Sequence, residues 1–596
     1  MKKRIRKTTV ALLMAAMIAA TGLSGCGQVK EAEVPTEEAT TEEATEVTVT
    51  EEATESADQE ETSEAKDEGE GSEAQNEDEN EAAKIDWAAI WPKISQASPI
   101  SPVEHLKDAD ICIEDYWESH EIKEDIERYA NYSYQKVILN DEGKKAFPKL
   151  AEAIDKYNTS AGNSKDRFYS DCSELIDNKN KSDDSEYRDE KNICLARVDD
   201  QVFSFRENYY SVIGETKGYY SSKGVNLDTN TGEEIKLSSV IADEDKFIET
   251  IYEKLNKKYP DLRNNDYVAY IVSEYIKENE DDFCWVMIPN GITVFFNPYN
   301  FGTYDMNAHE ITVTYLDNPE LFTDKYTADT DSWAVTLPEA YIDVNGDGKS
   351  DHIYWENDYD YENENYYDVM GINIYVNDKK YSFKYDEFNT NNVSTFIKNG
   401  NDYYMYVERT GASDIISYGV YKISGSEVTY VDVFGGGFSF NVNDHLNDYH
   451  MDRDLESHIN IYRNGCLYNP DHFYCCDTLY FAQVFGGIKT AKIGTDGQVN
   501  ELEEYYAVSE MSCKEISTIT DITAKEVDEA GNVGEKKTIP AGMKLKVFRC
   551  DNETFADCVL EDGSLIRFEV KKENTDSFFP DFIGEERIIE VLKAEE

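Results

Sequence analysis

The residues with the spacing of a metal site lie in one short run, Asp343-Val344-Asn345-Gly346-Asp347-Gly348-Lys349-Ser350-Asp351. Counting from Asp343, oxygen side chains stand at positions 1, 3, 5 and 9, and position 7 offers a backbone carbonyl. Calcium takes about six to eight oxygen ligands, and a glycine at position 6 lets such a loop turn sharply. The spacing predicts a structural calcium ion held by Asp343, Asn345, Asp347, Lys349 and Asp351.

The loop departs from the helix–loop–helix calcium pattern at position 12. Tyr354 stands where that pattern has a bidentate glutamate, and the run Ile353-Tyr354-Trp355 after the loop has the composition of a strand. The loop is therefore more similar to the calcium loops of extracellular β-repeats. The alternative is an ordinary turn rich in glycine and aspartate.

Enzyme motifs are not found in the sequence. The eight histidines include no His-Glu-x-x-His, because His309-Glu310 lacks the second histidine. Gly437-Phe438-Ser439-Phe440 lacks the second glycine of a nucleophile elbow. A glycosidase needs two carboxylates at a defined separation, which a sequence with 122 acidic residues does not single out. We therefore predict a protein without catalytic activity, with a wall hydrolase as the alternative.

Aromatic residues are abundant, with 42 tyrosines and 25 phenylalanines. Most such residues form strand cores and cross-strand pairs. Four tyrosines flank a variable loop, Gly214-Glu215-Thr216-Lys217-Gly218, and are our candidates for a ligand-binding face: Tyr209, Tyr210, Tyr219 and Tyr220.

The N-terminus has the pattern of a secretory signal. Five positive charges precede an apolar run from Val10 to Ala20, which is shorter than the ~20 residues of a membrane span. The processing site Leu23-Ser24-Gly25-Cys26 resembles the bacterial lipobox, in which the cysteine takes a diacylglycerol. Two acyl chains anchor a protein stably. Residues 1–26 are thus interpreted as a lipoprotein signal peptide with Cys26 as the lipidated residue, on the extracellular face of the cell membrane. An ordinary secreted protein and a signal-anchor helix are the alternatives.

Residues 27–83 are predicted to be a disordered acidic linker. They contain 22 acidic residues against Lys30 and Lys66, three copies of Glu-Glu-Ala-Thr, and no aromatic residue, leucine or isoleucine. Such a segment does not bury enough apolar surface to fold. The whole chain carries a formal net charge of −64, which repels phosphate backbones and argues against nucleic-acid binding.

Residues 84–325 are predicted to form an α+β domain. Apolar residues recur at helical spacing after Pro148, from Phe247 to Leu255 and from Val268 to Ile276. Strands are expected at 193–196, 202–206, 223–227 and 310–315, and Pro289-Asn290-Gly291 predicts a hairpin turn.

This region resembles the extracellular domain of the RsiV-type anti-sigma-V factors over residues 105–320. The resemblance rests on three runs: Val202-Phe203-Ser204-Phe205-Arg206-Glu207-Asn208-Tyr209-Tyr210-Ser211, Lys223-Gly224-Val225-Asn226-Leu227-Asp228, and Gly291-Ile292-Thr293-Val294-Phe295-Phe296-Asn297-Pro298-Tyr299. It implies an α+β fold and binding of lysozyme. Two departures limit it. The family's loop histidine is absent between Gly214 and Gly218, and too few residues precede the apolar run for a cytoplasmic anti-sigma segment.

The remaining chain is predicted to contain two β-rich parts. Residues 326–505 hold many short tyrosine-rich strands and the calcium loop, and residues 506–596 are similar to a small SH3-like β-barrel with a turn at Asp562-Gly563. The fold class is therefore multidomain, an α+β RsiV-like domain followed by a β-rich domain and an SH3-like barrel. Of the eleven cysteines, Cys550 and Cys558 are the best candidates for a disulfide.

These observations predict a surface-anchored lipoprotein that binds an envelope component without catalysis. The expected partners are the membrane, through the acyl anchor, and a basic protein such as lysozyme or a cell-wall glycan. The acidic composition favours a basic partner. A structural or solute-capture lipoprotein remains open.

Overall fold

The structure is a computed structural model. It describes residues 85–92, 100, 102–123, 128–161, 165–177, 186–214, 218–262, 265–277, 283–302, 307–328, 330–360, 368–385, 389–411, 416–435, 460–465, 467–510, 512–573 and 579–594. The fold below is that of the described residues from Trp87 onwards, which belong to one compact unit. The chain is multidomain and strand-rich, as predicted.

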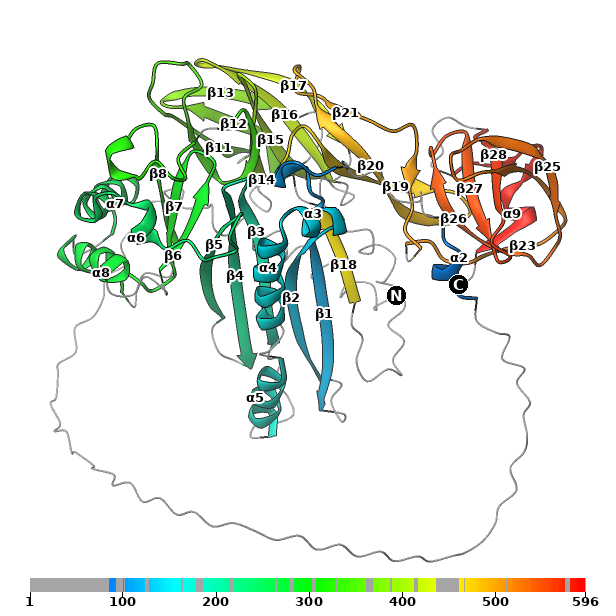
Figure 1. The fold of residues 1–596 in the computed structure, drawn as a ribbon, viewed down its shortest axis with the longest axis horizontal. Coiled ribbons are helices and arrows are strands. Elements are labelled where there is room, and N and C mark those ends of the chain that lie inside the picture. Colours follow the sequence, from blue (N-terminus) through cyan, green and yellow to red (C-terminus); the bar gives the residue numbers. More distant parts are fainter. Residues whose placement is uncertain are drawn as a thin grey trace, which may run out of the picture. The chain divides into compact units, whose positions relative to one another are not determined.

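The first sheet has six strands, five of them long, in the order β18-β1-β2-β3-β4-β5. Helices α4 and α5 pack against it (Figure 1). The strands are β1 Ile111–Lys123, β2 Arg128–Leu139, β3 Glu186–Val198, β4 Val202–Gly214, β5 Tyr219–Asp228 and β18 Asn460–Gly465, and the helices are α3 Asp141–Ala146, α4 Pro148–Ala161 and α5 Lys165–Asp177. Helix α4 begins at Pro148, whose missing N–H costs nothing at a helix start. Leu150 and Ile154 of α4 pack on Phe205 of the sheet.

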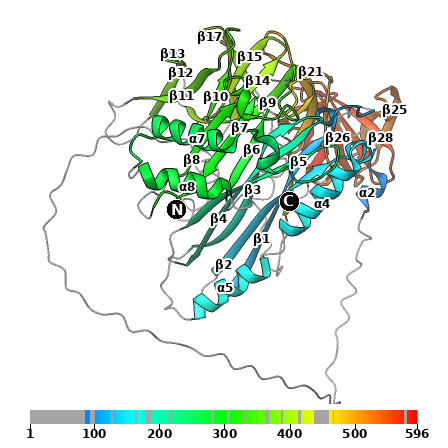
Figure 2. The ribbon, with the colours of Figure 1, turned by 60° about the vertical axis from the view of Figure 1, so that its left-hand side comes forward.

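A second, three-stranded sheet carries two antiparallel helices on one side (Figure 2). Its elements are β6 Cys284–Ile288, β7 Gly291–Phe296 and β8 His309–Thr314, with α6 Leu237–Val240, α7 Glu244–Lys258 and α8 Asn265–Lys277. Asp243 caps α7 by accepting the Lys246 N–H, and Phe247, Ile251 and Leu255 bury the helix face that the sequence predicts. The sheet lies against β5 at Gly224, where a Cβ would stand 1.7 Å from the Trp285 carbonyl oxygen.

The third part is a β-sandwich of a four-stranded and a five-stranded sheet. The strand orders are β10-β11-β12-β13 and β17-β16-β15-β14-β9. The bounds are β9 Ser332–Thr336, β10 Glu339–Ile342, β11 Asp351–Asp360, β12 Asp368–Val376, β13 Lys379–Lys384, β14 Asn389–Asn399, β15 Asp402–Gly411, β16 Ile416–Ser424 and β17 Glu427–Gly435. Ile353, Ile374 and Met405 are among the residues buried between the two sheets.

The C-terminal strands belong to a branched thirteen-stranded sheet. Its main strands are β19 Phe473–Tyr480, β20 Val484–Ile493, β22 Tyr506–Ala507, β24 Ile522–Val527, β25 Val533–Ile539, β26 Lys544–Cys550, β27 Phe555–Leu560 and β28 Leu565–Lys571, and its short elements are β21 Val499–Glu501, β23 Ile516–Thr518, β29 Phe582–Ile583, β30 Glu586–Arg587, α9 Ile588–Val591 and β31 Leu592–Ala594. Among the described residues the pairing from β19 to β25 is an open path and not a closed barrel. The SH3-like assignment stays a prediction.

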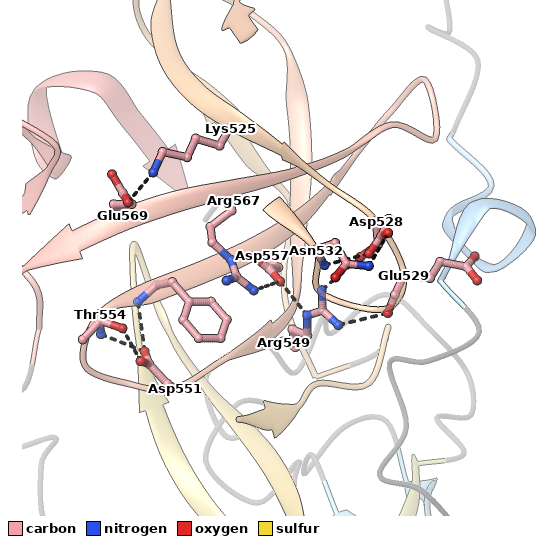
Figure 3. A network of polar contacts seen from close by, with 11 residues as sticks. Lys525, Asp528, Glu529, Asn532, Arg549, Asp551, Thr554, Asp557, Arg567 and Glu569 are labelled. Carbon is pink, nitrogen blue, oxygen red and sulfur yellow. Dashed lines mark hydrogen bonds and ion pairs between the residues drawn. The ribbon is translucent and has the colours of Figure 1, made fainter. Parts of the chain in front are cut away.

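A buried carboxylate holds β26, β27 and β28 together (Figure 3). Asp557, whose side chain is 0% exposed, accepts from Arg549 Nε at 2.5 Å and from Arg567 Nε at 2.6 Å. Arg549 also donates to the carbonyl oxygens of Asp528 and Glu529, which fixes the turn between β24 and β25. Hydrogen bonds from two guanidinium groups compensate the burial of this charge.

Several contacts cross the predicted domain boundaries. Strand β18 pairs with β1, Cys112 opposite Gly465. Trp87, in the short helix α2 (Trp87–Ile90), donates its indole N–H to Glu515 at 2.9 Å. Lys258 at the end of α7 donates to Glu339 of β10 at 2.7 Å. The segment 84–325 therefore depends on contacts with later parts of the chain.

The predicted disulfide between Cys550 and Cys558 is wrong in this structure. Both thiols are unpaired and buried. The register explains this: β26 and β27 place Cys558 opposite Val547, and Cys550 opposite Ala556. Burial raises the pKa of the Cys550 thiol to about 12, so it is an inert core residue.

A candidate binding surface at the end of the long sheet

The four tyrosines proposed from the sequence lie on neighbouring strands and form two pairs. On β4 and β5, Tyr210 is opposite Tyr220 and Ser211 is opposite Tyr219. Successive side chains of a strand point to opposite faces of a sheet. The pair Tyr210–Tyr220 therefore lies on one face and the pair Tyr209–Tyr219 on the other. The sequence predicts that the four tyrosines lie close together, but the face on which each one lies follows only from the strand register.

The outer ring of each pair is open to solvent. Tyr219 is 57% exposed and Tyr220 is 47% exposed. Tyr210 and Tyr220 have ring centroids 4.4 Å apart, and Tyr209 and Tyr219 have centroids 6.2 Å apart in an edge-on arrangement. Each exposed ring thus rests on a less exposed one, which limits the rotamer freedom that a partner would have to restrict.

The hydroxyl group of Tyr209 is bound by a buried carboxylate. Its hydroxyl donates to Asp189 Oδ2 at 2.6 Å. Burial raises the pKa of the Asp189 carboxyl, and the Tyr209 hydrogen bond offsets this only in part. Burial, followed by the hydrogen bond to Asp189, raises the pKa of Tyr209 to about 12. Tyr209 therefore supports Tyr219 as a neutral phenol.

A third exposed tyrosine joins this region and was not assigned from the sequence. Asn297, after β7, accepts from the Ser222 N–H at 2.7 Å and donates to the Ser222 carbonyl at 3.3 Å. This brings the loop with Tyr299 to within two residues of Tyr220 along β5. Tyr299 is 42% exposed and has a φ of +70°, an uncommon value for a bulky residue. Tyr219 and Tyr220 lie on opposite faces of β5, so a partner reaches both by contacting the edge of that strand, which is the last strand of the sheet. We call Tyr219, Tyr220 and Tyr299 the tyrosine surface.

The predicted calcium loop connects β10 to β11. Asp343 accepts from the N–H groups of Gly346, Asp347 and Gly348, at distances between 2.7 and 3.1 Å. Asn345 accepts from the Asp347 N–H, and Gly346 and Gly348 both have positive φ. The five predicted ligands therefore lie in one tight loop.

The carboxylates of the loop are engaged by donors within the protein. Asp351 accepts from the Val344 N–H and from the amides of Asn345 and Asn377, and Asp347 accepts from the Lys349 N–H. In the described part of the chain, no group of three His, Cys, Asp or Glu side chains is arranged to hold a metal. A bound ion would have to replace the bonds that Asp351 now accepts. Calcium stays a prediction from the spacing.

The predicted lipidation site, Cys26, lies outside the described residues. Within them, no helix is long and apolar enough to cross a membrane.

Comparisons with known proteins give little guidance. No family model matches the chain, and no curated protein matches it. A solved structure of a member of the DUF3298 family from Bacteroides fragilis is 12% identical with a TM-score of 0.28, and the match covers 36% of this chain and 94% of that one. A DUF3298 family protein from Pseudomonas aeruginosa is 11% identical with a TM-score of 0.25, covering 37% and 97%. Both scores are low, so neither likeness assigns a fold or a function to this chain.

Proposed function

We propose that this chain is a lipoprotein, anchored through Cys26 on the extracellular face of the cell membrane, that binds an envelope component without catalysis. The observation that carries the proposal is the tyrosine surface. Tyr219 and Tyr220 are about half exposed and each packs on a neighbouring ring, and Tyr299 is held in a turn with positive φ. Large, partly exposed rings with restricted motion are typical of binding anchors. Residues 27–83 act as the tether between anchor and binding surface.

The partner we favour is a basic protein such as lysozyme. The chain has 122 acidic against 58 basic residues, so its field attracts cationic proteins. Charge alone gives fast but unselective encounter, and the aromatic anchors supply the selectivity. The resemblance of residues 105–320 to an RsiV-like domain supports the same partner. A cell-wall glycan, whose rings stack on tyrosine, is the second candidate.

A structural calcium ion in the loop from Asp343 to Asp351 belongs to this proposal. Its support is the alternation of oxygen side chains and the positive φ of Gly348. In this proposal the ion stabilises the sandwich and takes no part in binding.

The test measures lysozyme binding to residues 27–596, because β18 and Trp87 make the segment 84–325 incomplete by itself. A hot-spot residue contributes about 2 kcal/mol, so Tyr219→Ala with Tyr220→Ala should weaken binding on the order of 30-fold or more. Tyr430→Ala is the matched control, because Tyr430 is 46% exposed but lies on β17. It should leave the affinity unchanged.

Salt separates selective capture from generic attraction. At 0.15 M salt the screening length is ~8 Å, so binding that depends on charge alone fades. Specific capture predicts that lysozyme still binds while an unrelated protein of equal positive charge is lost. Equal loss of both, or an unchanged affinity in the double variant, would refute the proposal. Retention on purified peptidoglycan without lysozyme binding would favour the glycan.

A further inference from the structure

A charged residue occupies an inward-facing position of the sandwich. Along β15, Met405 and Val407 are buried in the core between the two sheets. Arg409 is the next residue in this alternation, and it is 5% exposed. Across the strand on either side it is opposite Asn391 of β14 and Ser417 of β16. The guanidinium group of Arg409 is therefore part of the interior.

The buried guanidinium is only partly satisfied. Arg409 Nη2 donates to the Tyr421 hydroxyl at 2.5 Å, whereas Arg409 Nε is buried without a hydrogen-bond partner. In the described part of the chain, Arg409 has no ion-pair partner. By contrast, the other buried guanidinium described above, that of Arg549, is paired with the carboxylate of Asp557. A buried charge without a counter-ion is unfavourable.

Two aromatic rings line the site. The Arg409 Cζ lies 4.2 Å from the Tyr385 ring centroid and 5.8 Å from the Tyr421 centroid. Gly419 leaves room for the group, since a Cβ there would stand 1.8 Å from Arg409 Nη2. Cation–π contacts stabilise the charge from above the guanidinium plane. They leave the Nε–H at its edge without an acceptor.

The neighbouring polar groups bond to one another and do not reach Arg409 Nε. The Tyr385 hydroxyl donates to Asn391 Oδ1 at 2.6 Å, and Asn391 Nδ2 donates to Asn357 Oδ1 at 2.7 Å. Asn391 is 3% exposed. One end of the sandwich core is thus polar, with a cation as its only charge among these residues.

This polar end lies away from the predicted calcium loop. Arg409 is two residues from the end of β15, and Tyr385 directly follows β13. The opposite end holds the 343–351 loop, where the Gly425 N–H donates to the Val344 carbonyl. Binding sites on β-sandwiches commonly lie at one end, where the strand connections gather.

We propose that this end of the sandwich is a binding site for a small organic carboxylate, received by Arg409. The Nε–H and the second N–H of Nη2, beside the one donated to Tyr421, form the edge of a planar fork that matches the two oxygens of a carboxylate. A monoanion is favoured because one guanidinium neutralises one charge, whereas a dianion would carry an uncompensated charge into the core. Tyr385 and Tyr421 cover the apolar part of the ligand.

The test uses acetate as the probe and residues 27–596 as the protein. Chloride is replaced by acetate at constant ionic strength, and hydrogen exchange of β15 and β16 is followed. A ligand at a hundred times its Kd raises the folded-to-open ratio about a hundredfold, so protection should rise in proportion to acetate once its concentration exceeds Kd. Arg409→Met should abolish the rise, and Arg409→Lys should weaken it because the fork is lost. Arg587→Met is the control, since that guanidinium is 52% exposed, and it should change nothing.

A second measurement needs no variant and covers the case in which Arg409→Met fails to fold. Phenylglyoxal modifies accessible guanidinium groups, and peptide mapping reports the rate at Arg409. Modification that acetate slows supports the site. Three results would overturn it: an inert Arg409 in the folded chain, an effect of sulfate equal to that of acetate, or a response to acetate that persists in Arg409→Met.

Discussion

The contact between α7 and the sandwich gives a prediction whose size follows from the structure. Glu339 Oε1 accepts from Lys258 Nζ at 2.7 Å, and Glu339 Oε2 lies 2.7 Å from His352 Nε2. Burial alone would raise the pKa of Glu339, but the His352 hydrogen bond and the Lys258 charge outweigh it and lower the pKa to about 2. Its side chain is 13% exposed, so solvent screens these interactions little.

A fall in the pKa from 4.5 to about 2 corresponds to about 3 kcal/mol of folding free energy. Because the folded pKa is lowered, this contribution is complete above the unfolded value near 4.5 and is lost as the pH falls towards 2. The pKa of Glu310 is shifted in the opposite direction. Burial raises its pKa and the Lys258 charge offsets this only in part, so protonation of Glu310 relieves a cost at acidic pH.

Glu339→Gln should therefore destabilise the contact by about 3 kcal/mol near pH 7, and the difference from wild type should shrink towards pH 2. Urea unfolding measures the loss of stability near pH 7 and its decrease towards pH 2. Hydrogen exchange of β8 and β10 gives the local readout. Glu427→Gln is the matched control: Glu427 also lies 2.7 Å from a lysine, Lys379, but is 68% exposed. An exposed pair contributes less than about 1 kcal/mol. Equal losses in the two variants, or a Glu339→Gln effect independent of pH, would refute the reasoning.

Three further outcomes are expected. Cys26→Ala should release the protein into the medium or leave it unprocessed, and unchanged detergent-phase partitioning would contradict the anchor. Chelation should lower the thermal midpoint of the sandwich, since a ligand at a hundredfold excess over Kd stabilises by about 2.7 kcal/mol; Asp347→Ala should abolish this sensitivity, and Asp562→Ala, in an ordinary turn, should retain it. Asp557→Asn should cost about 3–5 kcal/mol by leaving two guanidinium groups without their carboxylate, as followed by urea unfolding, whereas Glu569→Gln, at an exposed pair, should cost less than about 1 kcal/mol.

Local patterns predicted local structure well. The helices at 148–161, 244–258 and 265–277 lie where apolar residues recur at helical spacing, and the hairpin turns at Asn290 as expected. The formation of these helices and of this turn depends mainly on residues that are close together in the sequence. Proline marks one boundary between strands: β25 ends at Ile539, directly before Pro540, which cannot donate to a ladder, and β26 begins at Lys544.

The long-range pairings were not predictable in this way. Strands β1 and β2 carry charged residues between their aromatic ones, so their sequences resemble polar loops. Their partners, and those of Trp87, come from distant parts of the chain.

The candidate sites also depend on contacts that the local sequence does not reveal. Tyr219 and Tyr220 are exposed, and their role in binding stays a prediction. Tyr299 joins them through Asn297, which no local pattern indicates. Arg409 follows Val407 and Glu408 in a run that has the composition of an ordinary half-exposed strand.

The pairing of β18 with β1 sets the order in which this protein can be completed. Cys112 and Gly465 are partners although roughly 350 residues separate them, a very non-local contact for any fold. At about 5–20 residues per second, synthesis of the intervening chain takes roughly 20–70 seconds. Throughout that interval one edge of β1 has no strand beside it, and an open edge is a template for association with other chains. A nascent or truncated chain that ends before Asn460 is therefore expected to associate with other chains more readily than the complete protein.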